Sequence, residues 1–148
     1  MAEFDTEMFA EQAVNIGLLS REQLNQTRDE AENGSFEALS RLLTRKGLLT
    51  SWQIDKILKG EVTGFVFGGC KVLFHLAEGT FARVYRGTKI HGGQPVAIKV
   101  LRRRFTTDRG SVDRFNQEAE AGLKLVHPNI VRILDYGVAD LLNFMIME

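Results

Sequence analysis

Apolar residues in the first sixty positions recur at helical spacing, in four short runs that are separated by glycines. The runs predict helices over residues 6–16, 21–32, 36–46 and 51–59. Each of these helices is too short to be stable alone in water, so we expect them to pack as two helix pairs. The residues expected to form their shared core are Leu19, Leu24, Phe36, Leu39, Leu42, Leu43, Leu49 and Ile54.

A short motif occurs twice in this helical segment. Residues Gly17–Gln23 recur as Gly47–Gln53, with the same glycine, leucine pair, hydroxyl residue and glutamine at matching positions. A glycine at the end of a helix can take a left-handed conformation. A Ser or Thr followed three residues later by Gln fits a capping box at the start of the next helix. The repeat therefore predicts two similar helix junctions.

From residue 66 onward the apolar runs become short and β-branched, which is typical of strands. The predicted strands are residues 70–76, 81–86, 96–101, 130–136 and 143–148. Residues Gly60–Gly64 contain two glycines and read as a linker, so the chain is expected to form two domains, residues 1–62 and 66–148.

One longer helical pattern lies between the third and fourth predicted strands. It begins at Ser111 or Asp113 and ends at His127-Pro128-Asn129, where proline fixes the turn. We expect His127 to bond locally. The apolar face of this helix is expected to contain Val112, Phe115, Ala119, Gly122, Leu123 and Val126.

Composition and charge narrow the classes of function. The chain of 148 residues is 44% hydrophobic and 26% charged, with a formal net charge of zero, so nothing general favours binding to nucleic acid or to a membrane surface. The basic triplet Arg102–Arg104 is accordingly interpreted as a solvated loop. Cys70 is the single cysteine, which favours a reducing, cytoplasmic location. No apolar run approaches the length of about 20 residues that spans a bilayer.

Lys99 introduces the first candidate chemistry. It lies inside the apolar strand Val96–Leu101, where an unpaired ammonium is costly, so it needs an anionic partner. Glu118 on the predicted helix is one candidate, and a bound phosphate is another. Residues Leu76–Val84 read as strand, tight turn and strand, and a turn of small residues lets backbone N–H groups approach phosphate oxygens. Together these features predict a nucleotide-phosphate site with Lys99 as its cation.

In their order and spacing, these motifs resemble the N-terminal lobe of a Ser/Thr protein kinase, over residues 66–148. The resemblance rests on the loop Leu76–Val84, on Val96–Lys99, on Glu118 and on His127–Val131. It implies an α+β fold, in which a small helical bundle precedes a five-stranded antiparallel sheet with one large helix. The repeated leader motif also resembles segments ahead of bacterial, planctomycete-type kinases. We interpret the bundle either as purely structural or as an interaction module with exposed apolar residues such as Trp52.

The resemblance also implies roles for individual residues. Lys99 would contact the α- and β-phosphates of ATP and form an ion pair with Glu118. Met147 would be the gatekeeper and Glu148 the start of the hinge. The residues implied in ATP binding are Leu76, Ala77, Glu78, Gly79, Thr80, Phe81, Ala82, Val84, Ala97, Lys99, Met147 and Glu148.

The loop departs from the family pattern, because only the middle glycine, Gly79, is retained and Ala77 and Ala82 replace the outer two. An alanine restricts positive φ, so it could stiffen the loop or hold it away from the phosphates. Two interpretations stay open: a working kinase with a tolerant loop, or a pseudokinase with weakened nucleotide binding.

The resemblance implies that the parent protein transfers the γ-phosphate of ATP to Ser or Thr of protein substrates, in signal transduction. The 148 residues contain neither the H-R-D catalytic loop nor the D-F-G motif. We therefore expect this chain alone to be inactive, and Mg²⁺ to bind only with a second lobe. The chain is expected to be a fragment of a larger kinase; the alternative is a half-kinase scaffold that binds partner proteins. Self-association through the helical leader or an exposed face of the lobe is a further expectation.

Overall fold

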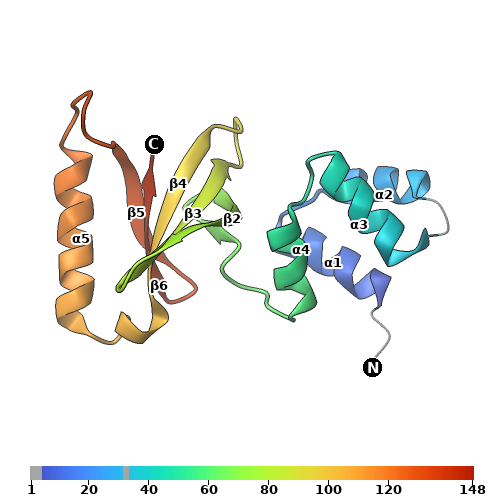
Figure 1. Ribbon diagram of the computed structural model, residues 1–148, viewed down its shortest axis with the longest axis horizontal. Coiled ribbons are helices and arrows are strands. Elements are labelled where there is room, and N and C mark those ends of the chain that lie inside the picture. Colours follow the sequence, from blue (N-terminus) through green and yellow to red (C-terminus); the bar gives the residue numbers. More distant parts are fainter. Residues whose placement is uncertain (1–4, 32–33) are drawn as a thin grey trace. The chain divides into compact units, whose positions relative to one another are not determined.

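Figure 1 shows the computed structural model, which describes residues 5–31 and 34–148. The chain forms two compact units that divide between Phe65 and Val66. The first unit is helical and the second contains the sheet. Among the described residues, no helix combines the length and the apolar character that crossing a membrane requires.

The helical unit contains the four helices that the sequence predicts. They are α1 (Thr6–Ile16), α2 (Arg21–Glu30), α3 (Phe36–Arg45) and α4 (Ser51–Leu58). Their bounds agree with the predicted ones to within two residues, and the predicted end of the second helix at residue 32 lies outside the described residues. Local sequence signals were sufficient here because each helix begins at a side-chain cap.

Both copies of the repeated motif form the predicted junction. Ser20 and Thr50 each accept the N–H of the glutamine three residues later, and that glutamine's side chain accepts the N–H of the capping residue. Gly17 and Gly47, which end the preceding turns, have positive φ angles of 93° and 72°. The capping boxes are therefore confirmed, and each copy of the motif reverses the chain between two helices in the same way.

The core of the helical unit differs in part from the predicted one. Phe36 and Leu42 were expected in the core but are only half-buried. Phe36 begins α3 and packs edge to face on Phe9, with ring centroids 5.1 Å apart. The residues that are buried here are Phe9, Ala10, Ala13, Leu18, Leu19, Leu24, Leu39, Leu43, Leu49, Ile54, Ile57 and Phe65.

Trp52 was named as an exposed residue only under the interaction-module interpretation, and the structure does not place it at the open surface. Its side chain is half-buried and meets the ring of Phe65 edge to face, with ring centroids 6.2 Å apart. The Lys56 ammonium lies 5.6 Å from the Trp52 ring and 5.2 Å from the Phe65 ring. Trp52 therefore belongs to the packing that closes the end of this unit, rather than to a free docking surface.

The second unit contains a six-stranded antiparallel sheet with the order β1-β2-β3-β4-β6-β5. The strands are β1 (Val66–Phe67), β2 (Cys70–Glu78), β3 (Ala82–Lys89), β4 (Pro95–Leu101), β5 (Ile133–Ala139) and β6 (Leu142–Met147). The five predicted strands are present, but the prediction of a five-stranded sheet is wrong. Strand β1 was missed because a run of two residues is too short to show alternation of apolar and polar side chains. It is a strand only because Val66 and Phe67 pair with β2.

The boundaries near β5 also differ from the prediction. This strand begins at Ile133, three residues after the predicted start, and both Ile130 and Val131 before it are exposed. The turn to β6 is shorter than expected, because it is made by Asp140 and Leu141 with positive φ angles of 52° and 66°. Residues other than glycine rarely adopt such backbone angles, so the sequence did not indicate a tight turn here.

The large helix α5 (Arg109–Leu123) lies along one face of the sheet (Figure 1). It begins earlier and ends earlier than predicted. Phe115 and Ala119 are buried as expected, but Leu123, the last residue of α5, and Val126, which lies beyond the end of the helix, are exposed. The core that the helix and the sheet share consists of Leu101, Phe115, Ala119, Ile133 and Met145.

Candidate functional site

Lys99 lies in the middle of β4 and belongs to a row of residues that crosses four strands. In this row, Ala77 is opposite Val84, Val84 is opposite Lys99, and Lys99 is opposite Met145. Residues directly opposite each other place their side chains on the same face of a sheet. Met145 belongs to the core under α5, so Lys99 points from the sheet toward that helix.

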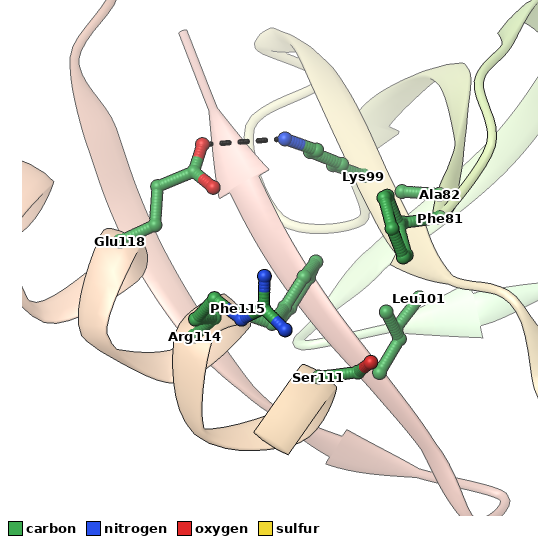
Figure 2. Close-up of a pocket in the computed structure, with 8 residues that line it drawn as sticks. All are labelled: Phe81, Ala82, Lys99, Leu101, Ser111, Arg114, Phe115 and Glu118. Carbon is green, nitrogen blue, oxygen red and sulfur yellow. Dashed lines mark hydrogen bonds and ion pairs between the residues drawn. The ribbon is translucent and has the colours of Figure 1, made fainter. Parts of the chain in front are cut away.

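Glu118 on α5 completes the ion pair that the sequence predicts. The Lys99 Nζ atom lies 3.2 Å from Glu118 Oε1. Figure 2 marks this contact between the two side chains with a dashed line. The side chains are 27% and 57% exposed, and an ion pair this accessible is worth only about 0–1 kcal/mol of stability. Its importance is therefore geometric, because it fixes the direction of the ammonium group.

Glu120 lies two positions after Glu118 on α5 and contacts a different strand of the sheet. Its carboxylate accepts a hydrogen bond from the Tyr136 hydroxyl at 2.7 Å. That carboxylate raises the pKa of the Tyr136 hydroxyl above its usual value. Helix α5 is thus connected to the sheet by two polar contacts, one to β4 through Glu118 and one to β5 through Glu120.

A cavity of about 230 Å³ opens between α5, β4 and the hairpin loop (Figure 2). Its apolar wall includes Leu101 and Phe115. Its charged groups are two cations, Lys99 and Arg114, and one carboxylate, Glu118. Because the carboxylate already pairs with Lys99, the cavity as a whole favours an anionic ligand. The lining residues are Phe81, Ala82, Lys99, Leu101, Ser111, Arg114, Phe115 and Glu118.

The structure brings four of the predicted site residues to this cavity, namely Phe81, Ala82, Lys99 and Glu118. Three others extend the same face of the sheet. Val84 is paired with Lys99, and Ala97, two residues before Lys99, is paired with Met147.

The remaining predicted residues lie outside the cavity lining. They are Leu76, Ala77, Glu78, Gly79, Thr80 and Glu148. Leu76 falls at an irregularity between β2 and β3 and is 52% exposed. Glu148 follows β6, and its N–H donates to the carbonyl oxygen of Arg132 at 2.9 Å. Contact of these residues with a nucleotide stays a prediction.

The basic triplet was interpreted as a solvated loop; Arg103 and Arg104 are exposed, whereas Arg102 is half-buried. Arg102 and Arg104 donate hydrogen bonds to backbone carbonyl oxygens of the hairpin loop. Within that hairpin, Arg83 lies 2.9 Å from Glu78 and holds the pKa of that carboxyl below its usual value. Arg102 and Arg104 therefore contact the loop that contributes Phe81 to the cavity.

Four cavity residues were missed by sequence reasoning although their spacing could have indicated them. Leu101 is two positions from Lys99 on one strand, so both point to the same side. Ser111, Arg114 and Phe115 lie seven, four and three positions before Glu118, spacings that share one helix face.

The histidines and the cysteine do not add a metal or nucleophilic site. His127 Nδ1 accepts the N–H of Asn129 at 3.0 Å, which confirms the expected local bond. Cys70 is buried, and burial raises the pKa of its thiol. Within residues 5–31 and 34–148, no three His, Cys, Asp or Glu side chains are grouped closely enough to hold a metal ion.

Comparison with known proteins gives a consistent family match for the second unit. The family model for protein tyrosine and serine/threonine kinases matches residues 70–148. The probable serine/threonine-protein kinase PknB of Lactococcus lactis is 39% identical over 79 residues, and serine/threonine-protein kinase PrkC of Bacillus subtilis is 36% identical over 83 residues. These matches cover 53% and 56% of this chain, which spans 13% of the length of each relative.

Among solved structures, the kinase domain of PknI from Mycobacterium tuberculosis is similar at 28% sequence identity and a TM-score of 0.49. The match covers 57% of this chain and 34% of that domain.

Proposed function

Because this chain belongs to the protein tyrosine and serine/threonine kinase family through residues 70–148, we propose that its second unit is the ATP-binding lobe of a Ser/Thr protein kinase. The lobe holds the phosphates of ATP beside Lys99 and places them for transfer to protein Ser or Thr. Transfer itself is proposed only for the whole kinase, since these 148 residues contain no H-R-D or D-F-G motif.

The single observation that carries the proposal is the Lys99–Glu118 ion pair, with its 3.2 Å contact at the edge of a cationic cavity. A lysine on a flexible stem is a mobile point charge, and a fixed carboxylate partner limits where its ammonium can lie. A phosphate next to Lys99 is then a second anion for the same ammonium. Binding is favoured because the cation is oriented before the nucleotide arrives.

The apolar residues on the same face suit the flat base of the nucleotide. Val84 and Ala97 are half-buried neighbours of Lys99 along the sheet, and Met147 lies across from Ala97. We assign the adenine to this region and the phosphates to the region of Lys99 and Phe81. Pockets for small ligands commonly combine such apolar walls with a few placed polar groups.

The two alanines in the loop carry no backbone strain, which favours a working nucleotide site over a pseudokinase. Among the described residues, only Asp140 and Leu141 are non-glycine residues with positive φ. Ala77 and Ala82 lie in β2 and β3, and Gly79 also has no positive φ. In this conformation the hairpin does not use the freedom that the family glycines provide, so alanine fits without cost.

Mg²⁺ is proposed to bind with ATP only when a second lobe supplies carboxylates. The single carboxylate that lines the cavity, Glu118, is already paired with Lys99. The residues described in this chain therefore do not form a magnesium site by themselves.

The proposal is tested by titrating ATP into the chain and into two variants by calorimetry. Glu118→Gln removes the carboxylate that orients Lys99, and we expect ATP affinity to fall by about tenfold. Glu120→Gln is the matched control on the same helix. It makes the same change in charge but leaves Lys99 and Glu118 paired, so affinity should stay within about twofold of the unaltered chain. Equal affinities for both variants, or no ATP binding by the unaltered chain, would overturn the proposal.

A further inference from the structure

The hairpin loop that joins β2 to β3, defined as Glu78–Phe81 and including the last residue of β2, is attached to the segment that follows β4. Arg102 makes most of these contacts. Its backbone N–H donates to the carbonyl oxygen of Phe81 at 2.8 Å, and its Nη1 donates to the carbonyl oxygen of Gly79 at 3.3 Å. Its Nη2 also lies 3.6 Å from the carboxylate of Glu78. One arginine thus contacts three of the four loop residues.

Arg104 contacts the fourth loop residue. Its Nη2 donates to the carbonyl oxygen of Thr80 at 3.3 Å, and its guanidinium lies 4.8 Å from the centroid of the Phe105 ring. Phe105 in turn packs against Phe81, with ring centroids 4.9 Å apart. Because Phe81 lines the cavity beside Lys99, this contact also sets the position of one cavity wall.

We propose that Arg102 and Arg104 are positioning residues that hold the loop Glu78–Phe81 in its nucleotide-binding position before a nucleotide binds. We call this set of contacts the arginine clasp. The assignment of the loop to a nucleotide rests on the proposed function; the attachment of the loop to the two arginines does not.

The clasp favours phosphate binding in two ways. A loop that is already ordered loses less conformational entropy when it closes over a ligand. The arginines also donate hydrogen bonds to the carbonyl oxygens of Gly79 and Thr80. Without these bonds, the partial negative charge of the two carbonyl oxygens would repel phosphate oxygens. The sequence of the hairpin is consistent with an ordered loop, because Ala77 and Ala82 stand where the family pattern has glycine. Alanine has less backbone freedom than glycine.

Arg103 offers a matched control within the same triplet. It is exposed, and in the described part of the chain its side chain has no hydrogen bond or ion pair with the loop. Replacing Arg103 by Ala removes the same charge from the same region, but leaves every contact of the clasp in place. A difference in hydrogen exchange or ATP affinity between Arg102→Ala and Arg103→Ala is therefore due to loss of the clasp contacts and not to loss of local charge.

The first measurement is backbone hydrogen exchange of the nucleotide-free, full 148-residue chain. In Arg102→Ala we expect exchange of the amides in residues 79–82 to rise by about tenfold, with a smaller rise in Arg104→Ala. In Arg103→Ala these amides should exchange as in the unaltered chain. The amides of Met145 and Ile146 in the buried strand β6 provide the internal reference for intact folding. Unchanged exchange in residues 79–82 of Arg102→Ala, with that reference intact, would overturn the clasp.

The second measurement is ATP affinity by calorimetry. We expect ATP to bind Arg102→Ala about fivefold more weakly than Arg103→Ala, and Arg102→Lys to recover only part of the loss, since lysine keeps the charge but loses the planar fork. Equal or tighter binding by Arg102→Ala would overturn the positioning role. If the unaltered chain binds no ATP, the proposed function fails, and the exchange measurement still decides whether the clasp exists.

Discussion

Lys99→Met is expected to lower the affinity of the chain for ATP by about 100-fold or more. The substitution removes the ammonium that lies 3.2 Å from Glu118 and keeps a side chain of similar length. It also leaves the Glu118 carboxylate without its cation at the edge of the cavity, where it would repel the phosphates. The loss should therefore exceed the value of a single charged hydrogen bond, and it should exceed the effect of Glu118→Gln.

The control for this prediction is Lys71→Met. Lys71 is also a half-buried lysine on a strand, and it lies in β2, outside the cavity lining. The two variants have the same charge and composition, so calorimetric titration with ATP isolates the position of the ammonium. Similar losses in both variants would mean that net charge, and not Lys99, determines binding.

Gly122→Ala is expected to destabilise the sheet-containing unit by about 1–3 kcal/mol, although alanine is the better helix former. A Cβ atom at Gly122 would overlap Ile133 Cδ1 and would lie 2.8 Å from Ile133 Cγ1 and 3.2 Å from its Cβ. Ile133 begins β5 and is 8% exposed, so its side chain has little room to turn away. The end of α5 must therefore move away from the sheet.

That movement has a consequence for the site. Glu118 lies one helical turn before Gly122, so lifting this end of α5 weakens the Lys99–Glu118 contact and lowers ATP affinity as well as stability. Gly110→Ala is the control in the same helix. The nearest atom to a Cβ there is Asp108 Oδ1 at 3.7 Å, an ordinary contact.

Thermal and urea unfolding should show Gly110→Ala to be as stable as the unaltered chain or more so, by up to about 1 kcal/mol. Gly122→Ala should unfold more easily than both. Equal stability of the two alanine variants would contradict a clash between residue 122 and Ile133.

The parts of the fold that could be predicted are those that depend on neighbours in the sequence. The capping boxes at Ser20 and Thr50 use residues three positions apart, so the start of α2 and of α4 followed directly from the sequence. The Lys99–Glu118 pair was predictable for a different reason. An unpaired ammonium in an apolar strand is costly, so Lys99 requires an anionic partner. The motifs that contain Lys99 and Glu118 also follow one another in the order found in protein kinases.

The parts that could not be predicted depend on residues that meet only in three dimensions. Strand β1 exists because Val66 and Phe67 pair with β2. The arginine clasp could not be predicted from the sequence, because Arg102 and Arg104 lie 23 and 24 positions after the residues whose carbonyl oxygens they contact. Three adjacent arginines read as a solvated loop unless the position of the hairpin is known, since charge runs usually face water.

The central claim is that ATP binds with its phosphates between the hairpin loop and Lys99. The measurement that tests it most directly is a titration of the ¹⁵N-labelled chain with ATP, followed by amide chemical shifts. We expect the largest shift changes at Gly79, Thr80, Phe81 and Lys99, with saturation in the micromolar range. The claim is contradicted if saturating ATP leaves these amides unchanged, or if the largest changes lie in other parts of the chain.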